Sequence, residues 1–157
     1  MVFYIIYAAQ GVQALQVDPV LQKFGALLRE NEGRHTTYSH LVQAQKAVVL
    51  YKKERVLDFD AILPLLPKDE DKRLKEMQAW SALLPQGNIH HLKILTGTYL
   101  DISAIMTALL NKDSKIKELS LMFSSDPLYS AIFLAIARHS NVMQVNLRVE
   151  RRAEAEA

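Results

Sequence analysis

The sequence predicts an α/β protein in which an N-terminal helical region precedes a short stack of strand–helix units with a small parallel sheet. Three segments with the same apolar spacing carry this prediction: Ile89-x-x-Leu92-x-Ile94, Ile116-x-x-Leu119-x-Leu121 and Val142-x-x-Val145-x-Leu147. They begin 27 and then 26 residues apart, and residues 101–115 align without a gap with residues 127–141, placing Ser114 on Ser140. A fixed period of this size indicates stacked units, which usually present a binding surface.

The composition limits the classes of function. The chain has 157 residues, half of them apolar, which suits one domain with a sizeable core. It has no cysteine, which excludes a disulfide scaffold, a thiolate metal site and a cysteine nucleophile. This fits a reducing compartment, so we expect a cytoplasmic protein, with export into a host cell as the alternative. The net charge of +2 gives no electrostatic reason to expect nucleic acid or an anionic membrane as a partner.

The N-terminal region, residues 1–87, is expected to be mostly helical. Its first segment, Val2–Ala9, is apolar but far shorter than the roughly 20 residues of a membrane span. It is predicted to be a buried helix or strand, and residues 1–14 as a secretory signal are the alternative. No Lys or Arg precedes the segment, which argues against a signal. The tail, residues 150–157, alternates charge and alanine and is expected to be frayed.

Helix start and stop signals divide the rest of this region. Asp18-Pro19 is a helix start, because Asp caps free N–H groups and Pro suits the first turn. Thr37 or Ser39 is expected to cap a second helix that runs to about Arg55. Prolines interrupt the chain at 64 and 67, and a charged amphipathic helix is predicted over residues 68–84. Its predicted inward side chains are Leu74, Met77, Trp80, Leu83 and Leu84.

From residue 89 the expected order is strand, loop and helix. Asp101 is predicted to cap the helix of the first unit, and Asp126 that of the second. No helix follows the third strand, so it is an expected edge strand, with neighbouring charges such as Arg148 to discourage pairing. Val56-x-x-Phe59 with the helix after it is a candidate earlier unit, and Val12-x-x-Leu15-x-Val17 is a fainter one.

The repeat from Ile89 to Val149 resembles the leucine-rich repeat family, and its long period with a full helix is similar to the ribonuclease-inhibitor-like class. The resemblance implies parallel strands joined by helices and a protein-binding role. The family's asparagine ladder is missing, because Gly97, Ser124 and Glu150 occupy its positions, so we expect a short and irregular stack. The combination of helices with a few repeats also resembles leucine-rich-repeat effectors of intracellular bacteria such as Legionella.

Alternation along the three strands assigns their faces. The apolar repeat positions should point into the core. The side chains between them form a grid on the other side of the sheet, here called the outer face: His91, Lys93, Leu95, Glu118, Ser120, Met122, Gln144, Asn146 and Arg148. Its mixture of charges, amides and apolar groups is typical of a partner surface. Cover by the chain's own helices and a plain solvated face are the alternatives.

Other patterns in the sequence are candidates for catalytic or metal sites. None of the five histidines forms an i, i+4 pair, so no metal ion is expected. Asp58 and Asp60 would share a strand face as a carboxylate pair, but a helix cap or a solvated charge is the simpler interpretation. No G-x-S-x-G elbow or Gly-rich phosphate loop is present, so neither catalytic residues nor a cofactor are assigned.

The predicted function is therefore protein binding, as a regulator or bacterial effector that binds and masks another protein. One alternative is an enzyme with an unfamiliar site in the N-terminal half, near Asp58, Asp60 or His35. Another is a subunit of an obligate complex or homo-oligomer, in which a second copy buries the end of the stack.

Overall fold

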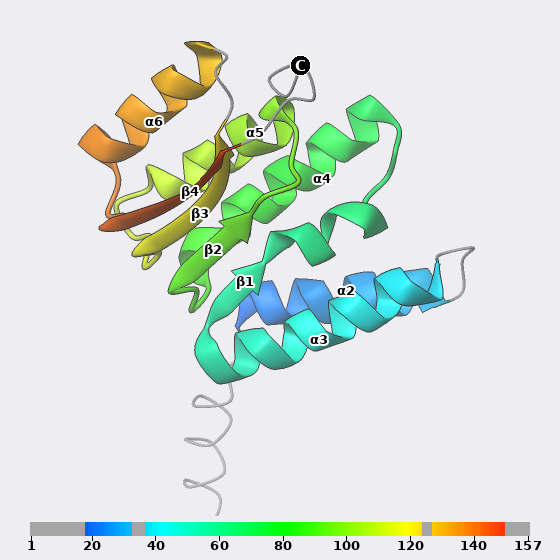
Figure 1. The fold of residues 1–157 in the computed structure, drawn as a ribbon. Helices are drawn as coiled ribbons and strands as arrows, with labels where there is room; N and C mark the ends of the chain where they lie inside the picture. The colour runs from blue at the N-terminus through cyan, green and yellow to red at the C-terminus, as the bar shows by residue number, and fades with distance from the viewer. Residues whose placement is uncertain (1–17, 33–36, 124–126, 150–157) are drawn as a thin grey trace, which may run out of the picture.

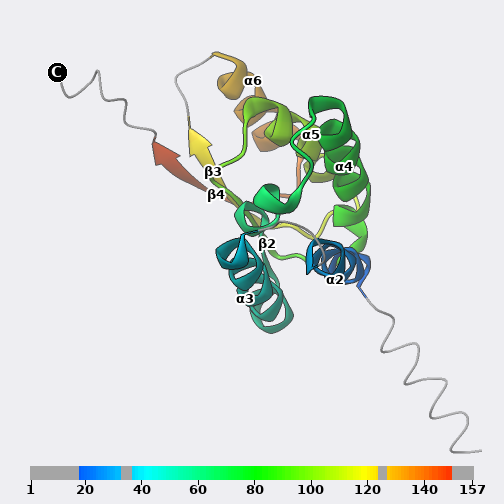
Figure 2. The same cartoon turned by 90° about the vertical axis from the view of Figure 1, so that its right-hand side faces the viewer.

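The computed structural model describes residues 18–32, 37–123 and 127–149, and its centre is a four-stranded parallel sheet (Figure 1). The strands follow one another in chain order: β1 Val56–Asp58, β2 His91–Ile94, β3 Glu118–Phe123 and β4 Gln144–Val149. Three helices connect them and lie together on one side of the sheet (Figures 1 and 2): α4 Glu70–Leu83, α5 Tyr99–Leu109 and α6 Pro127–His139. The predicted α/β class with a small parallel sheet is confirmed.

The sheet begins earlier than residue 88. β1 pairs in parallel with β2, with Val56 opposite His91, so the segment from Val56 and helix α4 form the candidate earlier unit. The helical region predicted over residues 1–87 therefore contains one strand of the sheet. The fainter unit at Val12, the segments 1–14 and 150–157, and the cap at Asp126 lie outside the described residues.

Equivalent residues make equivalent bonds in successive units. Ser114 Oγ accepts the N–H of Ile116 at 3.3 Å, and Ser140 Oγ accepts that of Val142 at 3.2 Å. Each serine thereby fixes the turn that leads into the next strand. The amide of Asn141 donates to the carbonyl oxygen of Ser114 at 3.0 Å, which joins one turn to the preceding one.

The N-terminal helices are α2, Pro19–Glu32, and α3, Tyr38–Glu54, and they lie beyond β1 at the first edge of the sheet (Figure 1). Asp18 Oδ1 accepts the N–H of Val20 at 2.9 Å, which confirms Asp18 as the cap of α2. Thr37 precedes α3, but its side chain makes no capping bond. Helix α3 ends at Arg55, whose left-handed φ of 59° turns the chain into β1.

The start of α5 differs from the prediction. Thr98 is its cap and accepts the N–H of Asp101, while the carboxylate of Asp101 accepts the N–H of Thr98 at 3.0 Å. Asp101 is therefore the third residue of a capping box, in which two free donors are satisfied reciprocally. The helix begins earlier than expected, at Tyr99, because this box uses both side chains.

One core joins the N-terminal helices to the stack. Trp80 of α4 is fully buried, and its ring meets those of Phe24 from α2 and Phe59 edge to face, with centroids at 6.2 and 5.6 Å. Phe59 begins the short 3₁₀ helix η1, Phe59–Ala61, which continues into η2, Leu63–Leu65. Trp80 and Met77 are buried as predicted. The prediction that Leu74 faces inward is wrong, because this residue is 43% exposed.

Eight of the nine predicted inward positions of the strands divide into two groups, and the ninth, Val142, is partly buried against the core. Six are at most 2% exposed: Ile89, Leu92, Ile94, Ile116, Leu119 and Leu121. Val145 and Leu147 are instead 37% and 48% exposed, so their assignment to the core is wrong. They do face the helix side of the sheet, but no helix follows β4 within the described residues to cover them. Within the same residues, every helix is too short or too polar to cross a membrane.

A polar joint ties the start of α2 to the end of α3 and to the loop before β2. The carboxylate of Asp18 accepts the hydroxyl of Tyr51 and the N–H of Asn88, the latter at 2.8 Å. Burial, and then the bond to Asp18, raise the pKa of Tyr51 above its usual value. Gly87 precedes the joint at a close approach of two chain segments, since an added Cβ would lie 2.5 Å from Val20 Cγ2 and 3.0 Å from Asp18 Oδ1.

Gly87→Ala is expected to lower the free energy of unfolding by about 1–3 kcal/mol, because the methyl group would overpack this joint. Gly25→Ala is the matched control. Its Cβ would meet only Arg29 Nη1, at an ordinary 3.5 Å, and Ala is the better helix former inside α2, so we expect a gain of about 0.5–1 kcal/mol. Urea denaturation followed by circular dichroism measures both, and equal effects of the two variants would contradict the proposed close approach.

Candidate functional site

The structure brings the strand residues of the predicted outer face together in register. His91 lies opposite Glu118, which lies opposite Gln144. In the next row Lys93 lies opposite Ser120 and Asn146, and Met122 lies opposite Arg148. The two views agree that the described helices of the stack gather on the other side of β2–β4 (Figures 1 and 2). Helices α2 and α3 flank β1 instead, so no described helix covers β3 and β4 on the outer face.

A hydrogen-bonded network connects three strands across this face. His91 Nε2 lies 2.7 Å from Ser120 Oγ. The amide nitrogen of Asn146 donates to Glu118 Oε2 at 2.7 Å and to Ser120 Oγ at 3.2 Å, and Gln144 Nε2 donates to Asn146 Oδ1 at 3.0 Å. Each bond restricts side chains that would otherwise rotate freely, so this surface is preorganised.

Charge is placed at two sides of the network. Lys93 lies opposite Asp58 of β1. Burial and the neighbouring carboxylate of Asp60 raise the pKa of Asp58, while Lys93 acts in the opposite direction. Arg148 is exposed on β4. Leu95 and Met122 have half-buried apolar side chains. Each directly follows a buried residue, Ile94 or Leu121, whose side chain points to the helix side of the sheet. The face therefore offers two cations, a fixed amide cluster and some apolar area.

A serine, a histidine and a glutamate lie together on this face, as in the triad of a hydrolase, but their geometry differs from that of a triad. His91 contacts Ser120, but its Nδ1 lies 3.7 Å from Glu118 Oε2, beyond hydrogen-bond range. Ser120 is only 8% exposed and sits in β3, between two paired strands, where neighbouring N–H groups are used by the ladder. We therefore interpret the three residues as part of the structural network.

Asp58 and Asp60 are anchors of the chain. Asp58 caps η1 by accepting the N–H of Asp60 at 3.2 Å. Asp60 accepts the N–H groups of Leu95 and Thr96 at 2.8 and 2.7 Å and thereby fixes the loop that follows β2. The interpretation of Asp58 as a cap is confirmed. The role of Asp60 was not anticipated, since its partners lie 35 and 36 positions away along the chain.

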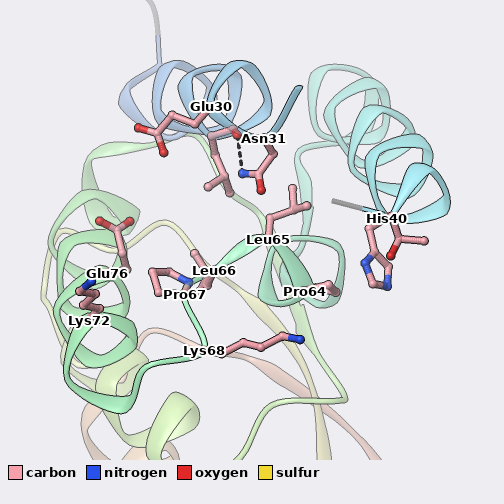
Figure 3. Close-up of a pocket in the computed structure, with 12 residues that line it drawn as sticks. Glu30, Asn31, His40, Pro64, Leu65, Leu66, Pro67, Lys68, Lys72 and Glu76 are labelled. Carbon is pink, nitrogen blue, oxygen red and sulfur yellow. Dashed lines mark hydrogen bonds between the residues drawn. The ribbon is translucent and has the colours of Figure 1, made fainter. Parts of the chain in front are cut away.

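A cavity of about 570 Å³ opens among α2, α3, η2 and α4 in the N-terminal half (Figure 3). Its lining mixes both charges and includes Glu30, His40, Lys68, Lys72 and Glu76. Asn31 is buried there and donates to the carbonyl oxygen of Leu27 at 2.8 Å. Asp58 and Asp60, the carboxylates considered as catalytic, do not line it. His35, the third residue named for the alternative enzyme site, lies outside the described residues.

Metal binding finds no support in the part of the chain that the structure describes. Within it, no three side chains of His, Cys, Asp or Glu cluster closely enough to hold an ion. His90 and His91 are adjacent on the chain, and their backbone N–H groups both donate to the carbonyl oxygen of Arg55, at 2.9 and 3.2 Å. This pair of bonds positions the start of β2 against the end of α3.

The outer face is thus the described surface with the most organised set of side chains. The pairing of the strands places eight of its nine predicted residues in register, while Leu95 follows the end of β2. The resemblance to leucine-rich repeats stays a prediction from the spacing of Ile89–Val149. No family model, curated protein or solved structure matches the chain.

Proposed function

We propose that the chain is a protein-binding module that uses the outer face of β2–β4, and that it acts as a regulator or effector by masking its partner. The observation that carries this proposal is the cross-strand network of His91, Glu118, Ser120, Gln144 and Asn146 on a face that no described helix covers. Side chains whose only role is to be solvated have no need of such mutual fixation. Side chains that are already fixed lose less conformational entropy when a partner binds to them.

The shape of the face favours a protein over a small molecule. Ligand pockets are concave and enclose most of their ligand. The outer face is an open sheet, and the cavities at α2–α4, at Asp18 and Lys115, and at Leu74 and Leu100 are lined by residues outside it. Strands lie about 4.8 Å apart, so the rows of polar and apolar side chains match the dimensions of a peptide or a protein surface.

The two cations of this face suggest that its partner carries acidic groups at matching positions. Lys93→Glu with Arg148→Glu is therefore expected to weaken binding at least about tenfold, or roughly 1.4 kcal/mol, because attraction becomes repulsion. Glu118 is left unchanged, since it accepts a bond from Asn146 and its loss would disturb the network. The matched control is Lys75→Glu with Lys112→Glu, two exposed lysines elsewhere that give the same change in net charge.

The partner is best captured covalently. A photo-crosslinking amino acid at Gln144, which is exposed on this face, is compared in lysate with the same group at Lys75 on α4. We expect one protein to be captured by the group at residue 144 and not by the group at residue 75. Its capture should be lost when Lys93 and Arg148 are changed to Glu, and it should persist in the control variant. Capture that is equal from both positions, or that survives the reversal of Lys93 and Arg148, would contradict binding through this face.

The setting of the proposed module follows from the sequence. The absence of cysteine fits a reducing compartment, so we propose action in a cytoplasm, with export into a host cell as the alternative. An enzyme in the N-terminal half is the less supported function. The observation that counts against it is the use of Asp58 as a cap and of Asp60 as a loop anchor.

A further inference from the structure

The cavity of about 570 Å³ in the N-terminal half has no part in the function proposed above (Figure 3). None of its described lining residues belongs to the outer face. We propose that this cavity binds a small organic anion, whose acidic head group lies beside Lys68 and His40 and whose apolar body lies on the leucines of the inner wall. This proposal does not depend on the function proposed for the outer face.

The cavity has the size and the setting of a ligand site. Small-molecule pockets have volumes of roughly 300–1,000 Å³ and are usually formed before the ligand binds. This cavity lies among α2, α3, η2 and α4 (Figure 3). The four elements share one core, to which they contribute Phe24, Ala44, Leu65 and Trp80, respectively. Their positions are therefore fixed in the free protein.

The inner wall of the cavity is apolar. Leu27, Leu65 and Leu66 line it and are at most 8% exposed. Pro64 and Pro67 continue the same wall and restrict its backbone (Figure 3). Apolar atoms at a cavity lack packing contacts on their open side. The hydrocarbon or aromatic body of a ligand would supply these contacts.

The charges at one end of the cavity are balanced. Glu30, Lys72 and Glu76 lie at this end (Figure 3). Lys23 forms an ion pair with Glu76 at 3.4 Å. Two carboxylates and two ammonium groups therefore gather here, so this end does not select a cationic ligand.

The other end carries cationic and donor groups without an acid from the described lining. The side chain of Lys68 extends toward Pro64, and His40 lies on the same side (Figure 3). Neither forms an ion pair with another described residue. Asp69, the acid next in sequence, accepts the N–H of Lys72 at 3.1 Å as the cap of α4. An ammonium group and an imidazole N–H beside an apolar wall suit a carboxylate or phosphate head group.

Two other cavities of similar size lack this combination. The cavity between the start of α2 and the loop before β2 has about 660 Å³ and no leucine in its described lining. The cavity between the starts of α4 and α5 has about 530 Å³ and also includes Lys68. Its arginine, Arg73, is already paired with Asp101, and the acids Glu70 and Asp71 line it as well. An apolar wall beside an uncompensated cation therefore favours the cavity of Figure 3.

Octanoate is the probe, because it joins a carboxylate to a short hydrocarbon chain. Octan-1-ol has the chain without the charge, and inorganic phosphate has charge without the chain. Each is titrated into the isotope-labelled full chain, and the NMR signals of the backbone amides report where it binds. We expect millimolar octanoate to shift the signals of the cavity lining, including the side-chain amide of Asn31. Octan-1-ol and phosphate should each bind at least about tenfold more weakly, since each lacks one of the two interactions.

Lys68→Gln with His40→Gln is expected to weaken octanoate binding at least about fivefold, because the head group loses its cationic partner and a donor. The matched control is Lys112→Gln with His139→Gln, which changes an exposed lysine and an exposed histidine outside the cavity and should bind like the wild type. Circular dichroism confirms that each variant is folded. The proposal is overturned if octanoate leaves the signals of the cavity lining unchanged, if octan-1-ol or phosphate binds as well as octanoate, or if both variants bind equally.

Discussion

Trp80→Ala is expected to lower the free energy of unfolding by about 3–5 kcal/mol, the usual cost of deleting a large aromatic side chain from a core. The ring is fully buried and packs edge to face against Phe24 and Phe59. The deletion removes both aromatic contacts and leaves a cavity at the junction of α2, η1 and α4. Urea denaturation followed by far-ultraviolet circular dichroism measures the loss, since the variant has no other tryptophan to report by fluorescence.

Trp80→Phe is the matched control. The indole Nε1 is buried without a hydrogen-bond partner among the described residues, so Phe keeps most of the packing and removes an unsatisfied donor. We therefore expect its loss to be well below that of Ala. Because Trp80 joins the N-terminal helices to the stack, the wild type should unfold in one transition. Two separate transitions, or equal losses for Phe and Ala, would contradict this role of the ring.

Periodic features were predictable from the sequence. The strands after residue 89, the long helices and the eight outer-face residues that lie in strands follow from apolar spacing and alternation. β1 stayed ambiguous because it has only three residues, Val56–Asp58, too few to establish a period. Alternation also placed Val145 and Leu147 on the correct side of the sheet. It could not show that nothing covers them there, because burial depends on which elements follow.

Contacts between distant residues had no signal in the sequence. The bonds of His91 to Ser120 and of Asn146 to Glu118 span 29 and 28 positions and exist only once the strands are in register. Asp60 was considered for its proximity to Asp58, but its partners lie after β2. The sequence predicts Asp101 as a helix cap, but it is the third residue of a capping box and the ion-pair partner of Arg73. Polar residues that serve the fold and those that serve a site look alike until their partners are known.

Arg73→Met is expected to cost about 3 kcal/mol at neutral pH, the lower end of the range for breaking a buried ion pair, because the arginine is partly exposed. The guanidinium of Arg73 donates two bonds of 3.1 Å to the two oxygens of Asp101, whose side chain is only 4% exposed. Burial alone would raise the pKa of Asp101, but the bonds from Arg73 and Thr98 outweigh it and hold the pKa below its usual value. Without the arginine, a buried carboxylate loses its main partner.

The dependence on pH separates this loss from a simple packing defect. A depressed carboxylate pKa contributes stability above the pKa of the unfolded chain, and that stability is lost as the pH falls through the folded value. The difference between wild type and Arg73→Met should therefore be largest near neutral pH, and it should narrow at acid pH until the pH falls below the lowered pKa of Asp101 in the folded wild type. Lys75→Met, an exposed change of charge on the same helix, should stay within about 0.5 kcal/mol at every pH. Urea midpoints measured across this range decide the matter, since a difference that does not change with pH would mean that packing of the arginine stem, and not the ion pair, stabilises the joint between α4 and α5.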